Sequence, residues 1–521
     1  MHRRGTCSAI KVNDGDICPT LATRCGTSPA DFTKYNPGKT VCSDLRAGQH
    51  ICCSAGTLPD YSPKPNADGT CATYTVQNND DCKKIAAANS ITTDNIKDWD
   101  AKSWGWTGCS PIQAGAKICV SKGDPPMPSV LKTAVCGPQK AGTKRPDNWD
   151  DIESLNLCPL NACCDIWGQC GTTAKFCTKT NSTTRAPATA KNGTDGCISN
   201  CGTDIVFDDT GFDDHPVLVG YHEAFQNTRP CLNLDVTAIN NTVEWGGQDG
   251  GHSIFDQTWD HIHFAFANIS EKFEVDVSSV KDEFDDFKKY SSPRKKPKVL
   301  SFGGWSFSTD LDSYAIFRKG VTGEQRSLFA SNVAKFADDN DLDGLDFDWE
   351  YPGAPDILGI PAGDSGGAPS SYWYLKGFPI KNISSVVDYI VYMTYDLHGQ
   401  WDYNSTWAAD GCDGSACLQS HINNTEILNS LSMITKAGVP NSKIVADLAS
   451  YGRSFGMVDP ACFGLECKFT GPDSTAMPGR CTRTPGYIAN ADIQEWLQGD
   501  QNITTYFDEV SRSNNDIIDN N

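Results

Sequence analysis

The chain has 521 residues, more than one hydrophobic core usually holds, so several domains are expected. Its net charge of −21 argues against nucleic acid and anionic membranes as partners. No apolar run approaches the roughly 18 residues that a membrane-spanning helix needs. The sequence therefore predicts a multidomain protein without a membrane span, and its basic run at residues 294–298 is interpreted as a solvated turn.

The 24 cysteines lie mostly within the first 201 residues. Crowding of this kind indicates disulfides made in an oxidising compartment, so we expect a secreted, extracellular protein. Residues 1–5 lack the hydrophobic core of a signal peptide, and we expect that a signal has been removed or that the true start lies upstream. Glycosylation acceptors support secretion and stand at Asn181, Asn192, Asn240, Asn268, Asn382, Asn404, Asn423 and Asn502.

Residues 7–53 and 71–120 form two cysteine-rich units that repeat one plan of strand, helix, helix and strand. The elements we expect are residues 9–12, 17–24, 29–35 and 49–52 in the first unit, and residues 74–76, 85–89 and 116–120 in the second. This repetition resembles LysM modules, which bind chitin and related polymers of N-acetylglucosamine. The alternative is a pair of disulfide-stapled spacers. Stretches rich in Pro, Gly, Ser, Thr or Asn are interpreted as linkers, at residues 54–70, 121–135 and 178–196.

A third cysteine-rich unit spans residues 136–201. Its spacing, Cys158-x4-Cys163-Cys164-x5-Cys170-x6-Cys177, resembles the hevein-type chitin-binding module. Eight cysteines alone allow 105 pairings. The resemblance, however, implies the pairs Cys136–Cys164, Cys158–Cys170, Cys163–Cys177 and Cys197–Cys201. Closely spaced cysteines could instead form a zinc site, but the secreted context and the lack of a Cys-x2-Cys pair disfavour this alternative.

The sugar face of hevein-type modules is an aromatic platform. By resemblance, Trp167 and Phe176 match two platform positions, and Gln169 stands where many relatives have a third aromatic ring. We therefore expect weak stacking in this module, with affinity recovered by joining several modules in one chain.

From residue 208 onward, apolar strand-like runs alternate with helical stretches, which predicts an α/β fold of the β/α-barrel type. Helices are expected at residues 323–338 and 424–437. Cys462, Cys467 and Cys481 mark a small α+β insertion. His222, His261 and His263 are interpreted as hydrogen-bonded barrel residues, not as ligands. The predicted strands are residues 217–221, 261–267, 298–302, 342–349, 387–394 and 443–451.

Residues 343–350, Asp-Gly-Leu-Asp-Phe-Asp-Trp-Glu, carry the clearest chemistry. On a strand, Asp346, Asp348 and Glu350 share one face, because side chains alternate. Three carboxyl groups there repel each other and resist burial, so at least one should keep a proton near neutral pH and could act as a general acid. The alternative is an exposed strand with a polar face. Asp343 has the wrong parity for this face and could be an ordinary loop carboxylate.

This stretch resembles the signature of the family 18 chitinases, Asp-x-x-Asp-x-Asp-x-Glu. Two further family motifs close apolar runs, one at residues 301–304 (Ser-Phe-Gly-Gly) and one at residues 393–396 (Met-Thr-Tyr-Asp). All three would stand where a barrel strand meets its following loop, the face on which such barrels carry chemistry. The resemblance implies a (β/α)8 TIM barrel across residues 208–521.

The resemblance also implies roles for individual residues. Glu350 would be the acid, and the acetamido group of the sugar would be the nucleophile. Asp348 would hold the acetamido N–H, Asp346 would share a proton with Asp348, and Tyr395 would hydrogen-bond the acetamido carbonyl. No metal or organic cofactor is required.

Three further residues are candidates for sugar binding. By resemblance, Asp396 would contact the sugar at the cleavage subsite. Trp401 and Tyr392 are candidate stacking residues, and core packing is an equal alternative for both.

Two features depart from the family pattern. Only 45 residues separate Glu350 from Tyr395, too few for the usual fifth strand and its helices, and residues 359–371 are rich in Gly, Pro and Ser. No eighth strand is evident before residue 521. We therefore expect an incomplete barrel that is not active as written, through a misread exon boundary or a shortened sequence.

The leading hypothesis is a secreted chitinase held on chitin by its N-terminal modules. The architecture also resembles the chitinase-like subunit of yeast killer toxins, which implies a toxin partner chain. The rival hypothesis is a lectin-like protein that binds chitin or its oligosaccharides without cleaving them. The carboxylates favour the enzyme, and the missing strands favour the binder.

Overall fold

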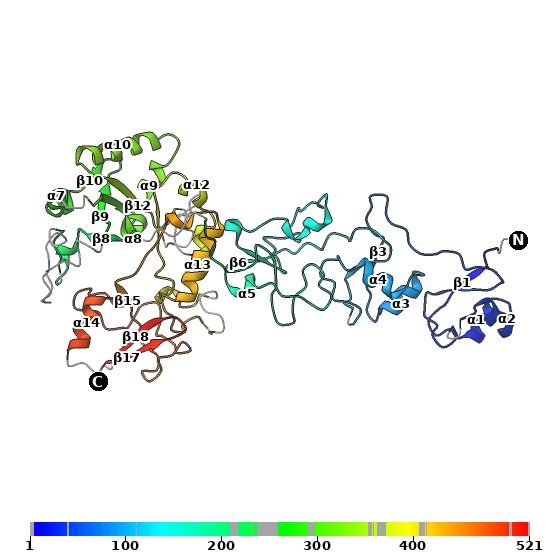
Figure 1. Cartoon of the computed structure of the whole chain (residues 1–521). Helices are drawn as coiled ribbons and strands as arrows, with labels where there is room; N and C mark the ends of the chain where they lie inside the picture. The colour runs from blue at the N-terminus through cyan, green and yellow to red at the C-terminus, as the bar shows by residue number, and fades with distance from the viewer. Residues whose placement is uncertain are drawn as a thin grey trace. The chain divides into compact units, whose positions relative to one another are not determined.

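The computed structural model divides into two compact units, which we call the N-terminal unit (Met1–Thr203) and the C-terminal unit (Asp204–Asn521) (Figure 1). In the described residues, no helix has the length and apolar character needed to cross a membrane. Part of the basic run at residues 294–298 and most of residues 359–371 lie outside the described part of the chain. The described residues are 5–38, 41–110, 112–208, 217–231, 233–236, 259–289, 296–352, 357, 359–361, 371–405, 412, 414–499 and 503–518.

The two repeats have the expected order of elements. The first contains β1 (Ala9–Lys11), α1 (Cys18–Arg24), α2 (Pro29–Tyr35) and β2 (His50–Cys52), and the second contains β3 (Thr73–Thr75), α3 (Cys82–Ala88), α4 (Thr93–Trp99) and β4 (Lys117–Cys119). In each repeat the two strands pair antiparallel. The first N–H groups of a helix have no partner within the helix and need a capping acceptor. The side chains of Ser28, Asp81 and Thr92 accept hydrogen bonds from such N–H groups at the start of α2, α3 and α4.

Each repeat buries only a few apolar side chains, such as Leu21 and Phe32 in the first and Ile85 and Ile96 in the second. Cores of this size rarely support a fold alone, and disulfides supply the remaining stability. The pairs are Cys7–Cys52, Cys18–Cys42 and Cys25–Cys53 in the first repeat, and Cys71–Cys119 and Cys82–Cys109 in the second.

The third unit is built on a small antiparallel sheet in the order β6-β5-β7. The chain here pairs the same cysteines that the hevein resemblance implies: Cys136–Cys164, Cys158–Cys170, Cys163–Cys177 and Cys197–Cys201. Its elements are η1 (Trp149–Ser154), η2 (Pro159–Asn161), β5 (Cys163–Asp165), β6 (Cys170–Gly171), α5 (Ala174–Cys177) and β7 (Cys197–Ser199).

Residues 178–196, which composition predicts to be a linker, are instead packed against the second repeat. Ala186 is buried in the apolar cluster of that repeat, beside Val76 and Trp106. The Thr184 hydroxyl donates to the Trp106 carbonyl at 2.5 Å, and the Gly105 N–H donates to the Pro187 carbonyl at 2.8 Å. The prediction of a free linker is wrong here, because small and β-branched residues also suit close packing.

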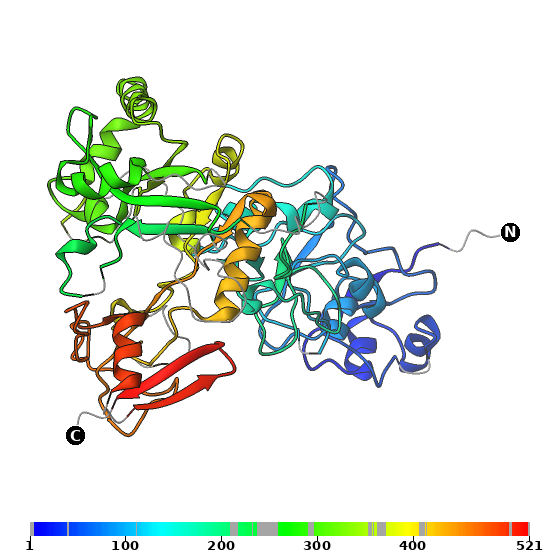
Figure 2. The ribbon, with the colours of Figure 1, turned by 60° about the vertical axis from the view of Figure 1, so that its left-hand side comes forward.

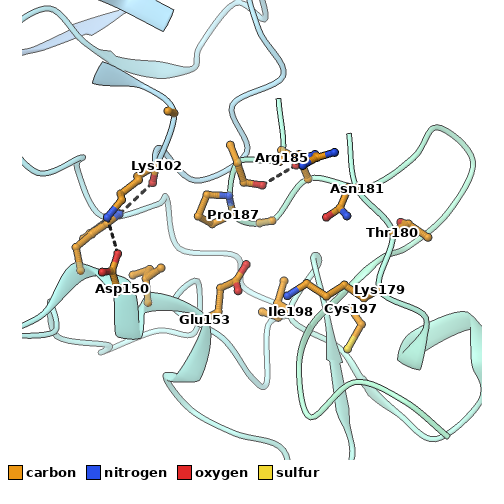
Figure 3. Close-up of a pocket in the computed structure, with 16 residues that line it drawn as sticks. Lys102, Asp150, Glu153, Lys179, Thr180, Asn181, Arg185, Pro187, Cys197 and Ile198 are labelled. Atoms are coloured by element: carbon orange, nitrogen blue, oxygen red, sulfur yellow. Dashed lines mark hydrogen bonds and ion pairs between the residues drawn. The ribbon is translucent and has the colours of Figure 1, made fainter. Parts of the chain in front are cut away.

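A cavity of about 340 Å³ lies where the second repeat meets the third unit (Figure 3). The Trp149 indole N–H donates to the Lys102 carbonyl at 3.0 Å, and the Lys102 ammonium pairs with Asp150 at 2.7 Å. Figure 3 shows this ion pair on one side of the cavity and Lys179 on the other. Burial raises the pKa of Glu153, which lines the same cavity. The two modules are therefore packed together rather than joined by a flexible connection.

The first half of the C-terminal unit is a sheet covered by helices. The parallel strands run in the order β8-β9-β11-β12, and β10 adds antiparallel to β9. Helices α7 and α10 lie near the sheet in both views (Figure 1, Figure 2). The elements are β8 (Val219–Glu223), η3 (Gln226–Thr228), β9 (His261–Ile269), β10 (Val275–Asp276), η5 (Ser278–Val280), α7 (Lys281–Lys289), β11 (Lys298–Gly303), α8 (Gly304–Thr309), α9 (Tyr314–Gly320), α10 (Arg326–Asp339) and β12 (Gly344–Asp348).

The second half begins with a separate parallel pair, β13 and β14. The predicted strand at residues 443–451 is two strands, because β14 ends at Ala446 and β15 starts at Tyr451. A small α+β region follows, in which the β17–β18 hairpin lies beside α14 (Figure 2). The elements are α11 (Tyr372–Leu375), α12 (Ile380–Ser384), β13 (Ile390–Tyr392), η6 (Gln400–Asp402), α13 (Asn424–Lys436), η7 (Asn441–Lys443), β14 (Ile444–Ala446), β15 (Tyr451–Arg453), β16 (Tyr487–Ala489), α14 (Asn490–Gln498), β17 (Ile503–Asp508) and β18 (Ser513–Ile518).

The sheet does not close into a barrel within the described residues. There, β12 pairs with β11 alone, and β13 pairs with β14 alone. Phe347, an apolar residue of β12, is 48% exposed, although its ring stacks on Phe302 with centroids 5.3 Å apart. An apolar residue on an inner barrel strand is left open when neighbouring elements do not cover it.

We predict that Ala186→Glu lowers the free energy of unfolding of the N-terminal unit by about 3 kcal/mol, because it places an unpaired charge in the core of the second repeat. Chemical denaturation followed by tryptophan fluorescence measures this. Lys191→Glu, on an exposed position of the same segment, is the matched control and should change stability by less than about 0.5 kcal/mol. Equal effects of the two substitutions would show that the segment is not packed.

Candidate active site

Asp346 is the centre of a partly buried hydrogen-bond network. Its Oδ2 accepts from the Tyr221 hydroxyl at 2.9 Å and from the Ser301 hydroxyl at 2.8 Å, and it lies 3.1 Å from Nδ1 of His263. Burial opposes ionisation of Asp346, but His263, assisted by the two hydroxyls, outweighs it and lowers the pKa of this carboxyl. On the other side of the His263 ring, Nε2 lies 2.7 Å from the Tyr389 hydroxyl. His263 is thus hydrogen-bonded within the fold, as predicted.

The pKa values of Asp348 and Glu350 are shifted in the opposite direction, upward. Burial raises the pKa of Asp348 well above its usual value, and the charges of Glu350, Asp346 and Asp447 add to this. Burial, followed by the charge of Asp396, raises the pKa of Glu350 to about 7. One buried carboxylate is therefore held ionised next to two that favour the neutral form. The structure brings together the three residues that the strand periodicity predicts on one face, and it does so in a form that can hold a proton.

Tyr395 follows β13, which ends at Tyr392. Burial and the charges of Asp447, Asp348 and Glu350 raise the pKa of its phenol, and its ring meets Tyr451 edge-on, with centroids 5.8 Å apart. The sequence analysis missed Asp447. A signal was available, because Asp447 ends the apolar run Ile444-Val445-Ala446 just as the other motifs end theirs.

Asp396 is held by an arginine that the sequence analysis also missed. The Arg453 guanidinium donates to both carboxylate oxygens of Asp396, with Nε 2.8 Å from Oδ1. His421 lies 3.3 Å from the same carboxylate. Burial opposes ionisation, but His421 and Arg453 lower the pKa of Asp396 to about 2. The Arg453 guanidinium also lies 4.8 Å from the Trp401 ring, half of which is exposed.

Tyr392 is not a sugar-stacking residue. Its exposed fraction is 0%, and its hydroxyl donates to the Ser430 carbonyl on α13 at 3.2 Å. The prediction that it binds substrate is wrong, and the core-packing alternative is correct. Residues alternate along β13, so Tyr392 faces the covering helix.

In the third unit, Trp167 is 55% exposed and available for stacking. Phe176 is half-buried and packs over Gly171, where an added Cβ would lie 2.3 Å from the ring. The Gln169 amide donates to the Thr133 carbonyl at 2.7 Å. Of the three platform positions, Trp167 presents the most open aromatic surface.

Within the described ranges, three groups of His, Cys, Asp or Glu come close enough to consider a metal. Each contains cysteines that form disulfides and therefore have no thiolate to offer. The site described above combines carboxyl, phenol, hydroxyl, imidazole and guanidinium groups, a set suited to moving protons and holding polar ligands.

Comparison with family models agrees with this site. Residues 218–364 and 365–516 match the family described as "Glycosyl hydrolases family 18", residues 152–185 match "Chitin recognition protein", and residues 10–54 and 74–121 match "LysM domain". The chain belongs to glycosyl hydrolases family 18, with two LysM modules and a chitin-recognition module before the catalytic fold. The predicted families and fold class are confirmed, including an α/β barrel that the described residues leave incomplete.

The chain is also similar to individual proteins. The chain is 48% identical to "Secreted chitinase LysM12" of Penicillium expansum, over 100% of this chain and 35% of that protein. It is 36% identical to "Killer toxin subunits alpha/beta" of Kluyveromyces lactis, over 94% of this chain and 40% of that protein. The chain thus spans little more than a third of the length of these curated relatives. Group IV chitinase of Ostrinia furnacalis, solved with allosamidin, aligns with a TM-score of 0.44 at 20% identity, over 58% of this chain and 82% of that one.

We predict that Tyr392→Leu destabilises the C-terminal unit by about 2–4 kcal/mol without changing affinity for chitin oligosaccharides, because the ring packs in the core. Trp401→Leu is the matched control and should weaken binding with a smaller loss of stability. Denaturation curves and calorimetric titration of both variants measure this. Weaker binding by a folded Tyr392→Leu protein would contradict this prediction and indicate that Tyr392 takes part in binding the sugar.

Proposed function

We propose that the protein is a secreted chitinase that cleaves β-1,4 linkages between N-acetylglucosamine residues with retention at C1. The observation that carries this is the set of three partly buried carboxyls, in which Asp346 is held ionised while Asp348 and Glu350 favour the neutral form. A general acid works best when its pKa is near the working pH, and Glu350 meets this condition.

In the proposed reaction, Glu350 gives its proton to the glycosidic oxygen as the bond from that oxygen to C1 breaks. The carbonyl oxygen of the substrate's acetamido group forms the new bond to C1, which yields an oxazolinium ion. Asp348 leaves its proton with Asp346, turns to the substrate and accepts the acetamido N–H. Water then attacks C1 as the bond from C1 to the acetamido oxygen breaks, and Glu350 accepts a proton from that water. The proton on Asp346 returns to Asp348, and two inversions at C1 give net retention.

Tyr395 and Asp396 would hold the reacting sugar. The phenol of Tyr395 is the donor for the acetamido carbonyl, and Asp396, fixed by Arg453, accepts from a sugar hydroxyl. Trp401, beside Arg453, offers an exposed ring for stacking on an adjoining sugar.

The N-terminal modules would keep the enzyme on insoluble chitin. One relative that aligns with the whole of this chain is named a secreted chitinase, and the twelve disulfides of the structure fit an oxidising compartment. Several weak sites in one chain act at high effective concentration, so their joint affinity exceeds that of each module.

One observation favours a second candidate, a chitin-binding protein that docks a toxin chain without cleaving. In the described residues β12 has a strand partner on one side only, and one relative is named as killer toxin subunits. Product release from a soluble chitin oligosaccharide decides between the two. A chain that binds chitin and releases no product would be the docking protein.

We predict that Glu350→Gln lowers the rate of hydrolysis by about two to four orders of magnitude, because the amide keeps the shape of the acid but has no proton of suitable acidity. Chitin binding should be nearly unchanged. In the unsubstituted chain, activity should fall as pH rises through about 7, where Glu350 loses its proton. Product analysis on short oligosaccharides measures both effects. A variant that cleaves at nearly the parental rate would show that Glu350 is not the general acid.

We predict that Trp167→Ala weakens adsorption to insoluble chitin more than Gln169→Ala does. The first change removes the most open ring of the platform, and the second removes an amide that is bonded to the protein's own backbone. Adsorption isotherms of the full chain on chitin particles measure this. Equal losses would mean that the platform is not the sugar face.

A further inference from the structure

The segment that follows β13 carries two residues of the proposed sugar site, Asp396 and Trp401, and one that the mechanism does not use, His398. His398 is 6% exposed, and so is Asp402 at the end of the same segment. Nδ1 of His398 lies 2.7 Å from Oδ2 of Asp402. This contact closes a short loop of the chain that contains Trp401.

The other nitrogen of the His398 ring contacts a helix. Nε2 lies 3.1 and 3.0 Å from the two carboxylate oxygens of Glu426, which stands in the first turn of α13. Helix α13 is itself bonded to β13, where the Tyr392 hydroxyl donates to the Ser430 carbonyl. His398 therefore ties the loop after β13 to a helix that is anchored on the same strand.

The position between two carboxylates sets the charge of His398. A neutral imidazole has one donor and one acceptor, whereas the imidazolium donates from both nitrogens. Burial opposes the charge, but the hydrogen bonds to Asp402 and Glu426 outweigh it and raise the pKa of His398 to about 9. Below that pH, His398 is a buried cation that donates to both carboxylates.

The direction of the Trp401 ring depends on this loop. Half of the residue is exposed, and its ring covers Gly399, where an added Cβ would lie 2.4 Å from the ring. The Arg453 guanidinium, which holds Asp396, lies 4.8 Å from the ring centroid. A half-exposed indole is oriented mainly by the backbone that carries it, so opening of the loop would turn it away from Arg453.

We propose that His398 is a positioning residue that holds the Trp401 ring beside Arg453, ready to stack on a sugar of the substrate. This inference rests on the proposed function and adds a residue that acts through Trp401 without touching the reacting atoms. A stacking surface that is already formed loses less conformational freedom when the ligand binds. His398 should therefore affect KM and leave kcat nearly unchanged.

The test measures kcat and KM of the full chain on a short soluble chitin oligosaccharide. The amide nitrogen of His398→Asn can replace Nδ1 and donate to Asp402, whereas that of His398→Gln can replace Nε2 and donate to Glu426. We expect His398→Gln to raise KM roughly tenfold, the size of one lost hydrogen bond to a charged group, with kcat within about twofold. His398→Asn keeps the bond that closes the loop, so its KM should rise by no more than about threefold.

A second background separates positioning from a structural role. In Trp401→Leu, the ring to be positioned is gone, so adding His398→Gln should leave KM where Trp401→Leu alone places it. A further rise of KM in that background would show a structural role and overturn the proposal, and so would a fall in kcat at unchanged KM.

Denaturation curves show whether His398→Gln is folded. If it is not, Glu426→Ala takes its place, because Glu426 is the more exposed partner, with 38% of its side chain accessible. Removing this acceptor should raise KM by about threefold in the parent and not at all in Trp401→Leu. An unchanged KM in the parent would overturn the proposal.

If the full chain releases no product, the proposed function fails, and His398 is tested by calorimetric titration with the same oligosaccharide. The N-terminal modules are identical in all these proteins, so the binding that Trp401→Leu removes belongs to the C-terminal unit. His398→Gln should remove the same binding. A His398→Gln protein that binds as its parent does would overturn the role of His398.

Discussion

The ionised carboxylate of Asp346 is the constraint on which the rest of the candidate active site depends. A buried charge is tolerated only when it is well hydrogen-bonded, and Tyr221, Ser301 and His263 meet this need. Because Asp346 stays charged, its neighbour Asp348 is driven to keep a proton. The acid at Glu350 is tuned by burial and by Asp396, so one network sets which carboxyls hold protons and which do not.

Strand register builds this network. In the parallel sheet Ser301 lies opposite Asp346, and β9 places His263 one strand further on, while β8 brings Tyr221 opposite His263. A shift of one residue in β12 would turn Asp346 away from all three partners. The apolar residues of β11 and β12 therefore matter to the chemistry as much as the carboxyls, since the helices that cover them fix the register.

Sequence patterns predicted those parts of the site that follow from alternation along one strand. Asp346, Asp348 and Glu350 were found from period two and from motif spacing. Both long helices and the predicted strands up to β13 were placed within a few residues, whereas residues 443–451 proved to be parts of two strands. Pairings between distant segments could not be predicted in this way. Arg453 reaches Asp396 from a different strand, Asp447 reaches Tyr395 across β13–β14, and the burial of Tyr392 depends on α13. The composition of residues 178–196 led to the wrong prediction of a free linker, because a segment rich in Thr and Ala can be either exposed to solvent or packed against a neighbouring module.

The two units are stabilised in different ways. Nine of the disulfides lie in the N-terminal unit, and a disulfide typically contributes about 2–4 kcal/mol by restricting the unfolded chain. The sheet of the C-terminal unit depends instead on strand pairing and on the aromatic cluster around Phe302 and Phe317. Strand β12 carries Asp346 and Asp348 and is followed by Glu350, yet it leaves Phe347 half exposed. Under the proposed function, a loss of covering elements at β12 would disturb the proton network in the C-terminal unit and leave the disulfide-stapled modules of the N-terminal unit intact, so cleavage would be lost before chitin binding.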